Sequence, residues 1–106
     1  MSTLSTHVLD AVRGAPAAAV PVALFDGDGT ELAAASTDGD GRIAGLGGEL
    51  APGTYRLRFG TGDYFASLGV PAFYPEVTIA FVVGDERHYH VPLLLSPYSY
   101  STYRGS

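Results

Sequence analysis

The chain has 106 residues, a net charge of −5 and no cysteine, and its six basic residues are all arginine. Disulfides and thiolate metal sites are therefore excluded, and an acidic chain without a basic stripe argues against nucleic-acid binding. Its longest apolar stretches are too short to span a bilayer and its first ten residues do not resemble a signal peptide, which together favour a cytoplasmic protein without a membrane partner.

Strand-forming residues recur at short intervals and are separated by Gly, Pro and Asp. In chain order the predicted strands are residues 4–10, 20–25, 31–37, 42–43, 54–59, 76–83, 86–95 and 98–104. Gly14-Ala15-Pro16 interrupts the strand pattern and ends the first strand. Asp26-Gly27-Asp28-Gly29 and Asp38-Gly39-Asp40-Gly41 are strong turn signals, the second leading into Arg42. Seven or eight short strands of this kind predict an all-β protein built as a two-sheet sandwich.

Two features interrupt the strand pattern. Residues 63–68 are the one good helix candidate, with Asp63 as a possible N-cap and with Gly69 and Pro71 to end it. Pro92 lies inside a predicted strand, yet proline has no N–H to give to a neighbouring strand. We expect either that its nitrogen points away from a partner strand or that the strand has a bulge there.

The last two predicted strands bring chemically capable groups together. His88 and His90 are two residues apart on a strand, so both side chains project from the same face. Ser96-Pro97 is typical of a hairpin loop. A loop of two, three or four residues places His90 opposite the first, second or third residue of the closing segment Tyr103-Arg104-Gly105-Ser106. Because sequential strands usually pair, the closing segment is expected to lie near His90.

The other candidates are weaker when each is taken alone. His7 lies on the first strand, where a lone histidine is usually a surface residue or a satisfied core residue. Arg42 follows a turn and by itself is best interpreted as a solvated residue. His88-x-His90 is a stronger signal, because strands use this spacing to aim two imidazoles at one ligand. Three histidines could also hold zinc in an open catalytic site, and spacing alone leaves that alternative open.

Several segments together resemble the transthyretin-related 5-hydroxyisourate hydrolases, and the resemblance covers nearly the whole chain. They are His7-Val8-Leu9-Asp10, Asp40-Gly41-Arg42, Phe73-Tyr74-Pro75-Glu76-Val77, His88-Tyr89-His90-Val91-Pro92-Leu93-Leu94 and Tyr103-Arg104-Gly105-Ser106. The chain is also similar to transthyretin, the hormone carrier. The carrier lacks the histidines that match His7 and His90, and it lacks the closing Tyr-Arg-Gly-Ser. The resemblance therefore points to the hydrolases.

This resemblance implies one transthyretin-like domain over residues 1–106, with two sheets and a short helix. It implies a homotetramer, a dimer of dimers, whose active sites lie in a channel where the dimers meet. The implied reaction is hydrolysis of 5-hydroxyisourate to 2-oxo-4-hydroxy-4-carboxy-5-ureidoimidazoline in urate degradation, without a metal or an organic cofactor. The implied catalytic residues are His7, Arg42, His90 and Ser106, and the implied substrate-binding residues are His7, Arg42, Tyr103 and Arg104.

The expected chemistry is the opening of a cyclic amide by water. An imidazole with a pKa of about 6.5 is a suitable base near neutral pH, and the pair His7 and His90 is assigned this role without deciding which nitrogen takes the proton. Arg42 is expected to bind the substrate and to stabilise the developing oxyanion. Ser106 is expected either to transfer a proton or to position substrate, and His88 is expected to be structural.

Three alternatives remain open at this point. The same channel could serve a carrier of small aromatic ligands that performs no chemistry. The histidines could form the zinc site of a metal-dependent hydrolase. A bare adhesion-type sandwich is the third alternative, and it would leave the closing tetrapeptide without a role.

Overall fold

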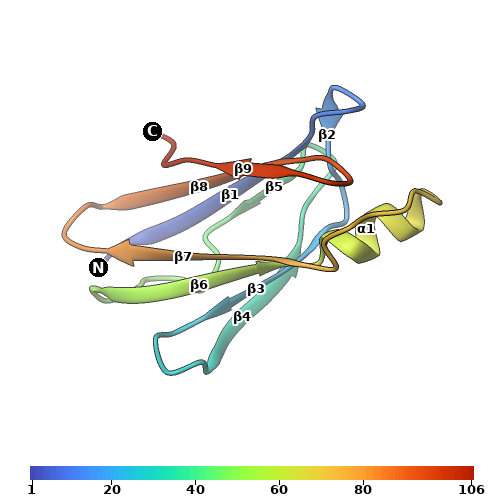
Figure 1. The fold of residues 1–106 in the computed structure, drawn as a ribbon. Coiled ribbons are helices and arrows are strands. Elements are labelled where there is room, and N and C mark those ends of the chain that lie inside the picture. Colours follow the sequence, from blue (N-terminus) through green and yellow to red (C-terminus); the bar gives the residue numbers. More distant parts are fainter.

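A computed structural model describes residues 1–106, and its strands form two sheets that lie face to face (Figure 1). The first sheet contains β1 (Thr3–Asp10), β2 (Ala15–Pro16), β5 (Arg42–Ala44), β8 (His88–Leu95) and β9 (Tyr100–Thr102). The second contains β3 (Pro21–Phe25), β4 (Glu31–Ser36), β6 (Gly53–Phe59) and β7 (Val77–Val83). The helix α1 (Thr61–Ser67) lies at one end of the sandwich. The predicted two-sheet architecture is confirmed.

The core lies between the two sheets because strand residues alternate between faces. In β1 every second residue from Leu4 to Asp10 is buried, and in β6 Tyr55, Leu57 and Phe59 are buried in the same way. Twenty buried apolar residues form one continuous cluster. Full burial of such a side chain stabilises the fold by about 1.5–3 kcal/mol, so this cluster holds the sheets together.

The pairing of β1 decides which residues share the outer face of the first sheet. β1 runs parallel to β8 in a continuous register from Thr3 opposite His88 to Asp10 opposite Leu95. Its other edge is shared by two short antiparallel strands: β5 pairs with residues 5–7 of β1, and β2 pairs with residues 9–10. The odd-numbered side chains of β1 and the even-numbered side chains of β8 therefore point away from the core.

One local expectation was wrong and another was incomplete. The helix begins at Thr61 after Gly60, and Asp63 lies in its first turn instead of capping it. The buried Thr61 and the hydrogen bond from the Gly62 N–H to the Pro75 carbonyl (3.0 Å) fix this earlier start. The segment Ala15–Pro16 does more than end the first strand, because it folds back as β2. No helix in the structure has the length and apolar character needed to cross a membrane.

The hairpin between β8 and β9 resolves the register that the sequence left open. Leu95 pairs with Tyr100, so the loop has four residues, and His90 pairs with Gly105 in an isolated bridge. β9 itself is shorter than predicted and ends at Thr102, opposite Leu93. The regular ladder therefore stops before it reaches Pro92, which has no N–H to donate. The register between β1 and β8 passes through Pro92 without a bulge.

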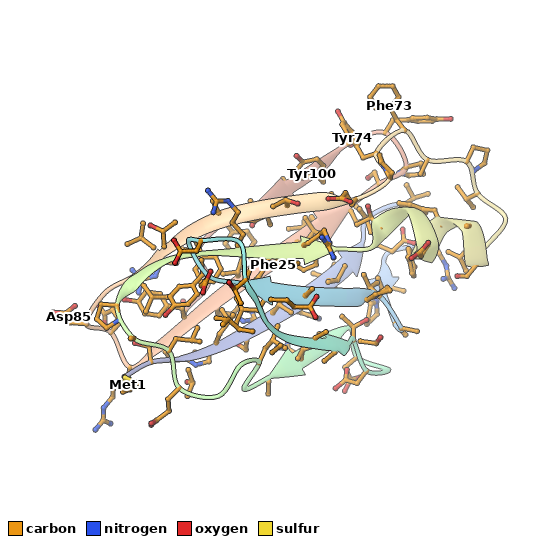
Figure 2. The ribbon with its side chains drawn as sticks, turned by 90° about the horizontal axis from the view of Figure 1, so that it is seen from below. Met1, Phe25, Phe73, Tyr74, Asp85 and Tyr100 are labelled. Atoms are coloured by element: carbon orange, nitrogen blue, oxygen red, sulfur yellow. The ribbon has the colours of Figure 1, made fainter.

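Exposed aromatic side chains gather at the end of the sandwich where the helix lies. Figure 2 shows Phe73, Tyr74 and Tyr100 together there, while Met1 and Asp85 lie at the opposite end. The Tyr74 ring meets the rings of Phe73 and Tyr100 edge to face, with centroids 5.0 and 5.3 Å apart. Phe73 remains 69% exposed, so this cluster forms an apolar surface on the single chain.

Candidate active site

Three of the predicted site residues share the outer face of the first sheet. His7 on β1 lies directly opposite Arg42 on β5. His90 on β8 lies opposite Ser5, two residues before His7 on the same face of β1. Diagonal neighbours of this kind in a sheet are about 7–8 Å apart between Cα atoms. The register therefore gathers two imidazoles and one guanidinium over three neighbouring strands.

A tight turn delivers Arg42 to this face. The Oδ1 atom of Asp38 accepts hydrogen bonds from the backbone N–H groups of Asp40 (2.9 Å) and Arg42 (3.0 Å). Chiefly because of the Arg42 N–H, the pKa of Asp38 lies below its ordinary value of 3.8. Gly41 has a φ of +75° and a Cβ there would overlap the Val8 carbonyl oxygen, so the turn requires glycine.

The same turn fixes the ring of His7. Its Nε2 lies 3.0 Å from the carbonyl oxygen of Asp40. A carbonyl oxygen only accepts hydrogen bonds, so the His7 Nε2–H donates and the neutral ring keeps its lone pair on Nδ1. His7 is half-buried, and this nitrogen is the one available to water or a ligand on the outer face.

The environment of His90 keeps its imidazole neutral near pH 7. Burial lowers the pKa of His90 below its ordinary value of 6.5. The positive charge of Arg42 lowers this pKa further. Because a neutral imidazole is a base and an imidazolium is not, His90 is ready to accept a proton at neutral pH.

The closing segment packs directly against His90. The Gly105 N–H donates to the His90 carbonyl oxygen at 2.9 Å. A Cβ on Gly105 would overlap the imidazole Cδ2 and come within 3.2 Å of Cγ. Gly105 therefore has to be glycine for the ring to occupy its place. Ser106 is the next residue in the chain and is exposed. Its backbone nitrogen is therefore bonded to the residue that packs against His90.

The other two predicted binding residues lie on a different side of His90. The Arg104 guanidinium carbon lies 4.9 Å from the ring centroid of Tyr89, a cation–π distance. Tyr89 belongs to the core face of β8, so within one chain Arg104 is directed away from the outer face. Tyr103, Arg104 and His90 help to line a pocket of about 300 Å³ beside β7. His90 is thus the residue that joins this pocket to the outer face.

The arrangement does not favour the zinc alternative. No group of three His, Cys, Asp or Glu side chains comes close enough together to hold a metal ion. One nitrogen of His7 is already used by a backbone carbonyl, and one nitrogen of His90 lies 2.7 Å from the Ser5 hydroxyl. Each of the three histidines is hydrogen-bonded to a side chain or a backbone carbonyl.

Sequence reasoning missed two partners of the histidines. The Ser5 hydroxyl contacts His90, and the Asp40 carbonyl contacts His7. Ser5 shares a face with His7 by simple alternation, and that was the available signal. Its contact with His90 depends on the parallel pairing of strands 85 residues apart, which strand patterns alone do not reveal.

Comparison with known proteins gives consistent results. Residues 4–105 match the sequence model of the HIUase/Transthyretin family. A 5-hydroxyisourate hydrolase of Caulobacter vibrioides is 50% identical over 115 aligned residues that cover 100% of both proteins. The solved structure of Klebsiella pneumoniae 5-hydroxyisourate hydrolase is 45% identical, covers 100% of both chains and superposes with a TM-score of 0.95.

Transthyretin itself is more distant in sequence. The structure of sea bream transthyretin in complex with thyroxine is 36% identical and has a TM-score of 0.91. That alignment covers 97% of this chain and 94% of the transthyretin chain. Fold and sequence agree over nearly the full length in each of these comparisons, and the chain belongs to the HIUase/Transthyretin family.

Proposed function

We propose that the chain is a metal-independent enzyme that hydrolyses 5-hydroxyisourate to 2-oxo-4-hydroxy-4-carboxy-5-ureidoimidazoline in urate degradation. The observation that carries the proposal is the gathering of His7, Arg42 and His90 on one sheet face, with the closing segment bound to His90. Curated relatives that share 44–50% of its residues over nearly all of the chain are named as hydrolases of this small molecule, and they support it.

In the proposed mechanism the histidine pair activates water. As the water oxygen bonds to the carbonyl carbon of the cyclic amide, one water proton passes to the neutral imidazole of His90. His7, with its free Nδ1, orients the water or the ring. The ring C–N bond then breaks, and the nitrogen leaves with the proton that the imidazolium returns.

Arg42 stabilises the negative charge that develops on the carbonyl oxygen during this attack. Its guanidinium is always charged and offers a planar set of N–H donors, which suits an oxygen-rich ring and an oxyanion. Its exposed position at the start of β5 leaves the guanidinium accessible from the outer face. A preorganised donor of this kind is worth roughly 10²–10³-fold in kcat.

The closing segment completes the site in this proposal. Tyr103 and Arg104 bind the substrate ring, and Ser106 positions it or relays a proton. Within one chain Arg104 stacks on Tyr89, so its binding role requires that substrate or a second subunit draws the guanidinium towards His90. This is the part of the site that depends most on assembly.

A homotetramer built as a dimer of dimers is part of the proposal. β7 and β9 are the edge strands of the two sheets on the same side of the sandwich, and an unpaired edge favours pairing with another chain. Exposed apolar side chains lie along this side, among them Val82 (71% exposed) and Tyr103 (58%). The outer face that holds the histidines is open and would line the channel between dimers.

Sedimentation velocity tests this assembly. A cytoplasmic location is also part of the proposal, and cell fractionation tests it separately.

A carrier without catalytic activity is the competing function. It would use the same face to bind small aromatic ligands and would bind 5-hydroxyisourate without turnover. The higher identity to the hydrolases, up to 50% against 36% for sea bream transthyretin, favours the enzyme.

The deciding experiment is an ultraviolet assay of freshly prepared 5-hydroxyisourate with a chelator present. The wild-type chain should accelerate the slow spontaneous decay strongly, and His90→Asn should lower kcat by roughly 10²–10⁴-fold, as expected for loss of a base. Circular dichroism and sedimentation should show an unchanged fold and assembly. A His90→Asn variant within a few-fold of wild type would disprove the assignment of His90, and binding without turnover by wild type would favour the carrier.

A further inference from the structure

We infer that Ser5, supported by His88, is a positioning residue that holds the His90 ring with its proton on Nδ1 and so leaves Nε2 free to accept a proton from water. The inference rests on the proposed role of His90 as a base. It concerns residues that neither strand patterns nor the family resemblance had assigned to the reaction.

Four side chains form one hydrogen-bonded row across β1 and β8. The Thr3 Oγ1 lies 2.7 Å from Nδ1 of His88, and Nε2 of His88 lies 2.9 Å from the Ser5 Oγ. The Ser5 Oγ in turn lies 2.7 Å from Nδ1 of His90. The parallel register creates this row, because it sets Thr3 opposite His88 and Ser5 opposite His90. Both nitrogens of His88 are thereby used, and His90 keeps only Nε2 for other partners.

The direction of the hydrogen bonds follows from the two ends of the row. A hydroxyl has one proton, so Ser5 donates to one histidine and accepts from the other. At the far end the Thr3 hydroxyl also reaches the carbonyl oxygen of Arg87, at 3.5 Å, and a carbonyl only accepts. Thr3 then accepts from Nδ1–H of His88, and Nε2 of His88 accepts from Ser5. Ser5 is left to accept from Nδ1–H of His90.

This direction suits a base, and the opposite one does not. With Nδ1 protonated, the lone pair of His90 lies on Nε2, the nitrogen that no side chain occupies. When Nε2 takes a proton, Nδ1–H continues to donate to Ser5, so nothing in the row has to reorganise. In the opposite direction the lone pair would face the Ser5 hydroxyl and would be unavailable to water.

A second contact holds the ring from another side. Gly105 approaches so closely that a Cβ there would overlap Cδ2 of His90. The Gly105 N–H donates to the His90 backbone carbonyl and fixes the strand at this point. The ring is therefore held at Nδ1 by Ser5 and at Cδ2 by the closing segment, and a half-turn about χ2 would lose the Ser5 hydrogen bond.

The charges around His90 determine the sign of the pH effect. The titratable and charged groups near it are His7 on β1, Arg42 on β5, His88 on β8, and Tyr103 and Arg104 of the closing segment. The positive charge of Arg42 disfavours the imidazolium. The Ser5 oxygen stabilises the imidazolium by accepting from Nδ1–H, so removing this acceptor should lower the pKa of His90 further.

The first test reads the tautomer directly in the full-length protein. Nitrogen-15 spectra recorded above pH 8, where the His90 ring is neutral, should show His90 protonated on Nδ1 in wild type and in Ser5→Thr. In Ser5→Ala the Nε2–H form should appear. His88→Phe should have a similar effect, because Ser5 is then free to turn its proton towards His90. A wild-type His90 protonated on Nε2 overturns the inference, whether or not the chain hydrolyses 5-hydroxyisourate.

The second test is kinetic. Ser5→Ala should lower kcat by roughly 10–100-fold, by analogy with the range found for groups that orient a metal-bound imidazole, with KM changed less than about two-fold. The acidic limb of its kcat/KM profile should move to lower pH, and Ser5→Thr should restore both. Ser101→Ala is the matched control, because Ser101 is an exposed serine on the same sheet, opposite Leu94.

The outcomes separate this inference from the proposed function. Wild-type kinetics and pH profile in a folded Ser5→Ala variant would overturn the positioning role while leaving the hydrolase intact. Absence of turnover by wild type would remove the proposed function, and the spectra would still report the tautomer. If Ser5→Ala does not fold, the wild-type and Ser5→Thr spectra decide the question.

Discussion

Two turns with nearly the same sequence have the same hydrogen bonds but different surroundings. They occupy residues 26–30 and 38–42, and each contains Asp-Gly-Asp-Gly. In both, Oδ1 of the first aspartate accepts from the backbone N–H groups two and four residues later, at 2.9 and 3.0 Å. In both, the fourth residue is a glycine with positive φ, +85° at Gly29 and +75° at Gly41. Local sequence therefore builds the same turn twice.

Tertiary contacts separate the two. A Cβ added at Gly29 would meet no atom of another part of the chain within 4 Å. This turn projects into solvent between β3 and β4. Gly41 is buried against the Val8 carbonyl of β1, and the neighbouring Asp40 carbonyl accepts from His7. The turn itself is therefore formed by local sequence, and packing against β1 makes only the second copy part of the proposed site.

The largest expected effect is a loss of activity when Arg42, the last residue of the second turn, is replaced. Arg42→Ala should lower kcat/KM for 5-hydroxyisourate by roughly 10²–10³-fold, because it removes a charged donor from the developing oxyanion. Thr30→Ala alters the equivalent position of the other turn and should leave activity unchanged. The ultraviolet assay measures both. Equal activity of the two variants would show that the second turn has no special role.

The glycines should differ in stability. Gly29→Ala places an L-residue in left-handed backbone with open space around it, which costs roughly 1–2 kcal/mol. Gly41→Ala adds overlap with the Val8 carbonyl, which costs roughly 1–3 kcal/mol more. Urea unfolding measures the two free energies. If the two variants were equally stable, the packing of the second turn against β1 would be less close than described.

The smallest expected effect is a change in thermal stability at acidic pH. The pKa of Asp38 is lowered in the folded chain, mainly by the Arg42 N–H, so its ionised form stabilises the fold. This stabilisation is present above the ordinary pKa of 3.8 and is lost as pH falls through the lower folded value. Between pH 5 and pH 3 the melting temperature of wild type should therefore fall more than that of Asp38→Asn. Parallel melting curves for the two proteins would argue against the turn hydrogen bonds as its cause.

Strand positions were predictable because they depend on alternation and on turn residues. Residues 54–59 alternate apolar and polar side chains, and the structure has β6 there. The helix start was misjudged because the buried Thr61 and the contact of Gly62 with Pro75 outweighed the capping tendency of Asp63. The strand Ala15–Pro16 was not predicted, because a two-residue strand has no alternating pattern.

The members of the proposed site could be named from the sequence, but their geometry was less predictable. His90 and the closing segment are close in sequence, so a hairpin was enough to bring them together, and only the loop length was open. His7 and Arg42 came from the family resemblance. Ser5 was missed, since its contact with His90 requires the parallel pairing of β1 with β8.

Local sequence was sufficient for most of the strands, for the two Asp-Gly-Asp-Gly turns and for the groups proposed to activate water and hold an anion. These properties follow from side-chain chemistry and from hydrogen bonds between residues only two to four positions apart. The tertiary structure alone decided that β1 lies between β5 and β8, which sets Arg42 beside His7 and Ser5 beside His90. That choice depends on which apolar faces pack together across the sandwich, a property of the whole core that no local segment contains.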